Sequence, residues 1–71
     1  MNTKTLQPDF GRTITEHRRK SRLSQRKIVE ILQQKGIEIT WQEYSKIENN
    51  RLLPSQDLID SLSEILNINK D

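Results

Sequence analysis

The fold is decided by a stretch near the middle of the chain that runs Ile39-Thr40-Trp41-Gln42-Glu43-Tyr44-Ser45-Lys46-Ile47-Glu48-Asn49. Its start matches a capping box, because Thr40 and Glu43 stand three residues apart and each side chain can accept a hydrogen bond from a free amide at a helix start. We therefore predict a helix over residues 41–48, with Tyr44 and Ile47 turned toward a core.

A second helix is predicted just before this stretch. Ser24 suits the N-cap of a helix from Gln25 to about Lys35, and Gly36 suits the left-handed conformation that often ends a helix. One face of this helix holds Ile28, Ile31, Leu32 and Lys35.

The beginning of the chain predicts another helix. It should start near Pro8-Asp9, where a proline and an acid suit a first turn, and should fade around Ser21-Arg22. Phe10, Ile14 and Arg18 follow one another at intervals of four and share its inward face.

The last helix opens after Pro54, with Ser55 as its N-cap and Asp57 in its first turn. Its buried face should consist of Leu58, Ile59, Leu62, Ile65 and Leu66. The sequence therefore predicts an all-α bundle of four, or at most five, short helices. We expect an N-terminal arm over residues 1–8, one domain over 9–68 and a tail over 69–71.

Composition excludes most kinds of catalytic or cofactor site. The 71 residues contain no cysteine, two glycines and a single histidine, His17. A disulfide framework, a thiolate zinc site and a glycine-rich phosphate loop are therefore all unsupported. We expect no metal, no cofactor and no enzymatic activity.

Charge is distributed unevenly along the chain. The net charge is only +2, but residues 1–35 hold nine Lys and Arg against three acids, a net of +6. Residues 36–71 hold three against seven, a net of −4. Such asymmetry favours a polyanionic partner, although a basic run on a helix is equally well explained as a solvated face.

Two charged residues fall on inward helix faces. Arg18 continues the apolar stripe of the first helix, and Glu48 follows Tyr44 by four residues. An unpaired charge in either place would be costly, so we predict that they pair with each other. The alternative is that one or both extend to solvent.

Three motifs in this order resemble the phage-repressor/Cro-like helix-turn-helix family, also called the XRE family. They are Leu23-Ser24-Gln25, the stretch 39–49 and Pro54-Ser55, and the similarity extends from about Phe10 to Asn67. The resemblance implies a lambda-repressor-like helix-turn-helix bundle that binds double-stranded DNA sequence-specifically, with helix 41–48 in the major groove. It further implies transcription regulation, expected as repression, and it matches Arg18 and Glu48 to a salt bridge of the family.

The resemblance also implies DNA contacts at particular positions. One residue at the start of the second helix should contact phosphate and brace the recognition helix, five on the recognition helix should reach DNA, and three in the following loop should lie along the backbone. In chain order these are Gln25, Thr40, Trp41, Gln42, Ser45, Lys46, Asn49, Asn50 and Arg51. Gln42 can pair with adenine and Lys46 with guanine or a phosphate, although an ordinary solvated helix surface would show the same residue types.

The chain departs from the family pattern in three places. The turn over residues 33–39 is longer than usual, so Ile37 should fold back after Gly36. Trp41 either presses on a thymine methyl or covers this turn near Ile37 or Ile39. Leu52-Leu53 either close the core, the reading we favour, or form a dimer contact.

Two other function classes remain open. An antitoxin-like protein-interaction module could use the same fold, and the basic half could bind nucleic acid or an anionic membrane surface without specificity. The membrane version is disfavoured because the apolar faces are needed for the core.

The partners and location follow from the same features. No run of apolar residues is long enough to span a bilayer and no secretory signal is present, so we expect a cytoplasmic protein. The resemblance implies a homodimer on DNA. The chain stops at residue 71, before a further helix that family members often use to close the fold or to dimerise. We favour an N-terminal domain of a longer sensor protein over a chain that dispenses with that helix.

Overall fold

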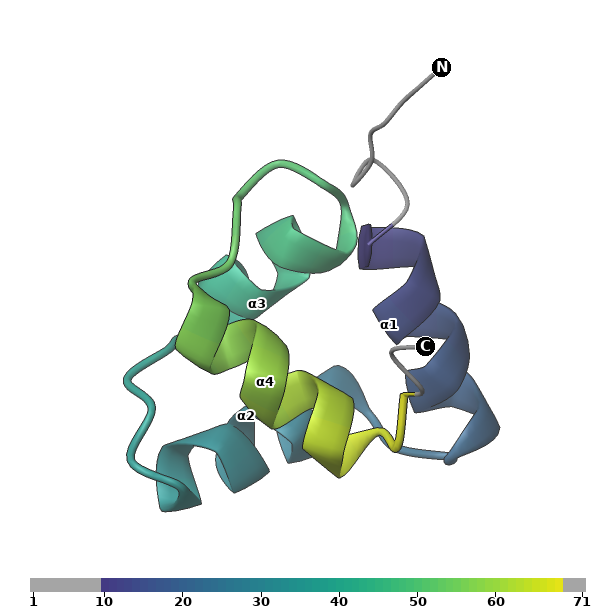
Figure 1. The fold of residues 1–71 in the computed structure, drawn as a ribbon, viewed down its shortest axis with the longest axis horizontal. Coiled ribbons are helices and arrows are strands. Elements are labelled where there is room, and N and C mark those ends of the chain that lie inside the picture. Colours follow the sequence, from purple (N-terminus) through teal and green to yellow (C-terminus); the bar gives the residue numbers. More distant parts are fainter. Residues whose placement is uncertain (1–9, 69–71) are drawn as a thin grey trace.

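The computed structural model describes residues 10–68 and contains four α-helices joined by short loops (Figure 1). They are α1 (Phe10–Lys20), α2 (Gln25–Gln34), α3 (Trp41–Glu48) and α4 (Gln56–Ile65). No strand and no fifth helix occur between residues 10 and 68, so the expected all-α class is confirmed with four helices. The expected N-terminal arm over 1–8 and tail over 69–71 lie outside the described residues, as does the predicted helix start at Pro8-Asp9.

Three helices begin at the hydroxyl caps that the sequence predicts. The side chains of Ser24, Thr40 and Ser55 each accept a hydrogen bond from the backbone amide three residues later. At α3 the capping box is complete, because the Glu43 carboxylate also accepts from the Thr40 amide at 3.0 Å. Local polar chemistry therefore defines where these helices start.

All four helices end in the same backbone closure. At the end of α3, Asn50 has a left-handed φ of 61°, and the Arg51 amide reaches back to the Lys46 carbonyl at 2.8 Å. Matching closures end the other helices, with left-handed residues at Arg22, Gly36 and Asn67. This arrangement is a Schellman motif, which satisfies carbonyls that a helix end leaves free.

The core is built from one apolar face of each helix. In Figure 1, α4 crosses in front of α2, α3 lies above them and α1 closes the bundle on the right. The fully buried side chains are those of Ile14, Ile28, Leu32, Tyr44, Ile47 and Leu62. The predicted inward stripes of the second, third and fourth helices supply most of this core, but Ile31, Lys35 and Ile59 lie outside it and Val29, which was not predicted, belongs to it.

The longer turn between α2 and α3 folds back onto the core. The Ile37 amide donates to the Leu32 carbonyl at 3.0 Å, as expected for a chain that returns after Gly36. The Gln33 side chain donates to the Ile39 carbonyl, also at 3.0 Å, and Ile39 itself is buried. These contacts hold the additional residues of the turn against the bundle.

Leu52 and Leu53 do not close the core, so that prediction is wrong. Leu52 is 40% exposed and Leu53 is 89% exposed. The two leucines instead border an open apolar groove that they share with Phe10, Ile47, Asn50, Pro54 and Ile59.

A glycine allows α1 to approach the end of α3 closely. The Gly11 amide donates to the Asn50 side-chain oxygen at 3.1 Å, which satisfies an amide in the first turn of α1. A side chain at this position would collide with the Glu48 carbonyl and would lie 2.7 Å from the Ile47 carbonyl. Both obstacles are backbone atoms, which cannot rotate away.

We expect Gly11→Ala to lower the free energy of unfolding by about 2–3 kcal/mol, in the range of an overpacked core. Gly36→Ala is the matched control, because Gly36 has a φ of 88° but open space around it, so its cost should be limited to about 1 kcal/mol of backbone strain. Urea unfolding followed by circular dichroism measures both. Equal costs for the two variants would contradict the close approach of α1 to α3.

Candidate nucleic-acid interface

The position of α3 is set by the buried carboxylate of Glu48. This side chain is only 5% exposed and receives hydrogen bonds from Arg18 Nε at 2.7 Å and from the Tyr44 hydroxyl at 2.5 Å. A third comes from Gln25 Nε2 at 2.9 Å. The carboxylate therefore ties α1, α2 and α3 together at one point, and it forms the ion pair that the helix faces predict.

Arg18 extends this connection to the turn between α1 and α2. A second guanidinium nitrogen of Arg18 lies 3.3 Å from the other oxygen of Glu48, and a third donates to the Leu23 carbonyl at 2.8 Å. The planar fork of arginine suits such a two-point contact with a carboxylate.

The hydrogen bonds around Glu48 decide its protonation. Burial by itself raises the pKa of Glu48, but the hydrogen bonds from Arg18, Tyr44 and Gln25 together outweigh it, so the pKa lies below its ordinary 4.5. Burial and the Glu48 carboxylate both raise the pKa of Tyr44 above its ordinary 10. At neutral pH, Glu48 is therefore a charged acceptor and the Tyr44 hydroxyl is a neutral donor.

We expect Glu48→Gln to lower the free energy of unfolding by about 3–5 kcal/mol at pH 7, because it leaves Arg18 without its buried counter-charge. The matched control is Glu64→Gln, which removes an exposed pair with Lys35 and should cost less than about 1 kcal/mol. Urea unfolding measures both, and a cost near zero for Glu48→Gln would contradict the structural role of the pair.

The same variant tests the pH dependence. A carboxylate with a lowered pKa in the folded state stabilises the fold fully above its unfolded pKa of about 4.5, and this stabilisation is lost as the pH falls through the folded pKa. The difference in unfolding free energy between wild type and Glu48→Gln should therefore shrink as the pH is lowered from 4.5. A difference that stays constant down to pH 2 would contradict the lowered pKa.

Gln25 links Glu48 to the first residue of α3. While its amide nitrogen donates to Glu48, its Oε1 accepts from the indole nitrogen of Trp41 at 3.0 Å. Gln25 thus contacts α3 at both ends. Each polar atom of the Gln25 side chain keeps one further hydrogen-bonding position.

Trp41 contacts the start of α2. The residue is 42% exposed, and its indole nitrogen donates to Gln25 Oε1. Contact of its exposed part with a thymine methyl stays a prediction. The Arg26 guanidinium lies over the ring, 5.6 Å from its centroid, which is within the range of a cation–π contact. Sequence reasoning missed Arg26, because Trp41 lies fifteen residues further along the chain and no local pattern connects them.

The outer face of α3 presents Gln42 and Lys46 to solvent, one helical turn apart. Within residues 10–68, neither side chain makes a hydrogen bond or an ion pair, and the same holds for Arg51 in the following loop. These three are the candidate DNA contacts whose polar groups remain fully available.

Three of the remaining candidates, Thr40, Asn49 and Asn50, also serve the protein itself. Thr40 caps α3, the Asn49 amide donates to the Ser45 carbonyl at 2.9 Å, and Asn50 accepts from Gly11. Ser45 is half-buried, and its hydroxyl makes no hydrogen bond among the described residues. For Thr40, Asn49 and Asn50 a structural role is therefore already present, and the capping glutamate occupies the Thr40 amide that could have bound a phosphate.

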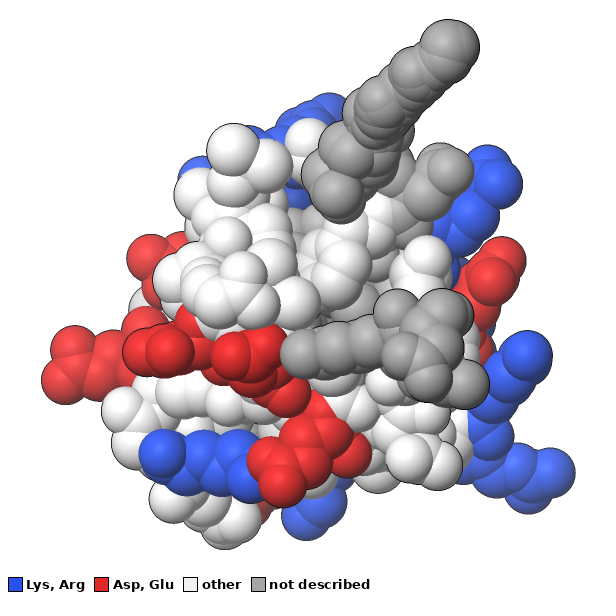
Figure 2. Space-filling view, in the orientation of Figure 1, with Lys and Arg blue, Asp and Glu red and all other residues white. Residues whose placement is uncertain are grey.

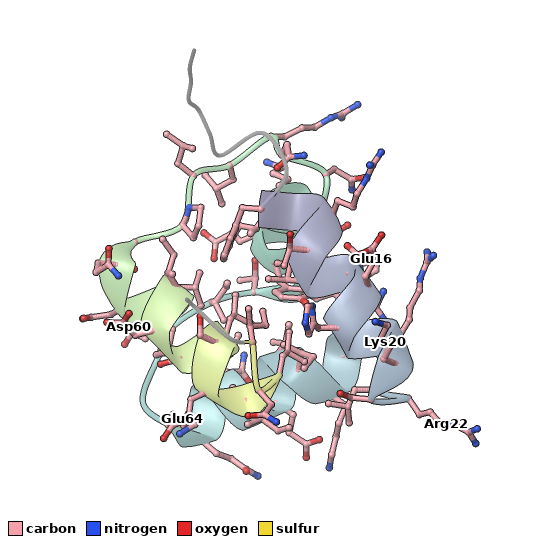
Figure 3. All side chains as sticks on the ribbon, turned by 45° about the vertical axis from the view of Figure 1, so that its right-hand side comes forward. Glu16, Lys20, Arg22, Asp60 and Glu64 are labelled. Carbon is pink, nitrogen blue, oxygen red and sulfur yellow. The ribbon has the colours of Figure 1, made fainter. Side chains whose placement is uncertain are left out.

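Acidic side chains are concentrated around α4 (Figure 2), where Lys35 pairs with Glu64. Acidic side chains gather over α4 on the face shown in Figure 2, while basic side chains lie toward its edges. In Figure 3, Asp60 and Glu64 extend from α4 on the side opposite Lys20 at the end of α1 and Arg22 in the turn after it, although the acidic Glu16 also lies on that side. A polyanion would therefore be repelled from the α4 face.

The single histidine of the chain lies in α1. His17 Nδ1 lies 2.9 Å from the Thr13 carbonyl, one turn earlier in α1. Residues 10–68 contain no group of three His, Cys, Asp or Glu side chains that could hold a metal ion. Every helix in this range is too short and too polar to cross a bilayer.

Comparison with known proteins adds no relative: no family model, curated protein or solved structure matches this chain.

Proposed function

We propose that this chain is a sequence-specific double-stranded DNA-binding domain of a transcription regulator that acts as a repressor, with α3 in the major groove of its operator. One observation carries the proposal. The inner face of α3 is fixed by the Glu48 network, whereas Gln42 and Lys46 on its outer face have no partner among residues 10–68. Such a rigid helix with two free polar side chains has the geometry that base contacts require.

The side chains on this face suit base edges. Gln42 can bind adenine through its N6 and N7 positions, and Lys46 can donate to O6 or N7 of guanine. Arg51 follows the end of α3 and can bind a phosphate, which would position the domain without distinguishing sequences. The acidic side chains of α4 would keep that helix away from DNA and so favour this docking orientation.

Selection from a pool of random duplexes tests the proposal, and we expect one motif to be enriched. Gln42→Ala should weaken the free energy of binding to that motif by about 1–3 kcal/mol and should relax the base preference at one position. Arg51→Ala should instead weaken binding to all duplexes about equally. The absence of any enriched motif, together with binding that simply falls with salt, would contradict sequence specificity.

A matched control for Gln42→Ala is Gln34→Ala. Gln34 is also an exposed glutamine on a helix, but it lies at the end of α2, where the neighbouring Lys35 contacts Glu64 of α4 at 3.2 Å. This substitution should leave the selected motif and the affinity unchanged.

We further propose that two copies bind one operator, with half-sites about 34 Å apart. The favouring observation is the apolar groove, where Leu53 is 89% exposed. Asn50 lines the groove and Arg51 follows directly, so the groove borders the loop that we assign to the DNA backbone. A second copy on the adjacent half-site would approach this edge.

Leu53→Glu should therefore abolish cooperative binding to a two-site duplex, measured relative to the variant's own affinity for a single half-site, which the added charge two residues after Arg51 also lowers. Gel-shift titrations on the two duplexes measure both quantities, and Ser21→Glu provides a control for added negative charge at an exposed loop. Undiminished cooperativity in Leu53→Glu would contradict a contact between copies at this groove.

The alternative function is a protein-interaction module of the antitoxin kind, and the same groove favours it. In that case a different protein would cover Leu53, and random duplexes would yield no enriched motif. The selection experiment therefore separates the two functions before any partner is known.

A further inference from the structure

The start of α2 holds a basic side chain that the DNA-contact positions implied by the sequence do not include. Arg26 is exposed, and its guanidinium lies 5.6 Å from the centroid of the Trp41 ring. Among residues 10–68 no carboxylate pairs with it. Its neighbour Lys27, by contrast, pairs with Glu30 at 3.4 Å.

The Trp41 ring is fixed at two points. Its indole nitrogen donates to Gln25 at 3.0 Å, and one face carries the Arg26 guanidinium. Gln25 is fixed in turn by the buried Glu48 carboxylate at 2.9 Å. The position of Arg26 is therefore connected through Trp41 and Gln25 to the point that also fixes α3.

The hydrogen-bond donors of Arg26 are available. A guanidinium has five N–H groups, and none of those of Arg26 makes a hydrogen bond or an ion pair within residues 10–68. An arginine held in this way has less rotamer freedom to lose when it binds an anion. By contrast, the indole has only one polar group, and that group is already bonded to Gln25, so Trp41 has no donor left for a base.

We infer that Arg26 binds a phosphate of the DNA backbone and that Trp41 is a positioning residue that holds Arg26 and Gln25 for this contact. The inference rests on the proposed DNA-binding function. In this arrangement Trp41, the first residue of α3, orients side chains at the start of α2. Gln42 and Lys46 then discriminate between bases.

The free protein provides the first test. Trp41 is the only tryptophan, so its indole N–H gives a single resonance in the proton spectrum. This proton should exchange with water more slowly than that of a free indole, and Gln25→Ala should remove the protection. Exchange at the rate of a free indole in the wild type would overturn the positioning role without bearing on DNA binding.

Titration of DNA provides the second test, with the most enriched duplex and an unrelated duplex of the same length as probes. Arg26→Ala should weaken binding to both by about five- to tenfold at 0.1 M salt and should lower the slope of log K against log salt by about 0.9. Lys27→Ala removes one charge from the same helical turn and should change affinity by less than about twofold.

Variants of Trp41 test its role as a positioning residue. Trp41→Ala should weaken binding about as much as Arg26→Ala without changing the preferred base at any position, and the double variant should be no weaker than either single one. Trp41→Phe keeps an aromatic face for Arg26 and should recover part of the affinity. Thermal unfolding of each variant verifies that the fold is intact.

Three results would overturn the inference while leaving the proposed function in place. They are an affinity of Arg26→Ala within twofold of the wild type, an equal loss in Lys27→Ala, and a changed base preference in Trp41→Ala. Failure of the wild type to bind any duplex would overturn the inference and the proposed function together.

Discussion

The buried carboxylate of Glu48 is the interaction on which the rest of the structure depends. A charge in so small a core is tolerated only when its hydrogen-bonding positions are filled, and here Arg18, Gln25 and Tyr44 fill them from three helices. A domain of 59 described residues can bury only a small apolar core. The hydrogen bonds of the Glu48 carboxylate take over part of the role that a larger apolar core would have. They also fix the relative orientation of the helices, since hydrogen bonds are directional and apolar contacts are not.

This network connects stability with the proposed recognition surface. Gln25 belongs to both, because it donates to Glu48 and accepts from Trp41 at the exposed start of α3. A substitution at Trp41 would therefore affect the buried Glu48 carboxylate through one side chain, that of Gln25. Residues that share a network in this way are not expected to contribute additively to either stability or binding.

Local signals in the sequence were sufficient to predict most of the fold. Ser24, Thr40 and Ser55 mark helix starts because an N-cap acts within three residues, and the pairing of Arg18 with Glu48 follows from two inward faces that each hold one charge. Leu52 and Leu53 were assigned wrongly because two adjacent leucines in a loop have no periodicity that distinguishes inside from outside. The contacts of Trp41 with Gln25 and Arg26, and of Gly11 with Asn50, were missed because they depend on how helices meet.

The left-handed closures at Arg22, Gly36, Asn50 and Asn67 have a consequence for folding kinetics. Each closure forms between residues at most five positions apart, so every helix can define its own end before it contacts another helix. Such local contacts require little loop-closure entropy, and helical domains rich in them fold in microseconds to milliseconds. By comparison, Arg18 and Glu48 are 30 residues apart. We therefore expect the meeting of α1 with α3 to limit the folding rate, with both helices already terminated when the ion pair forms.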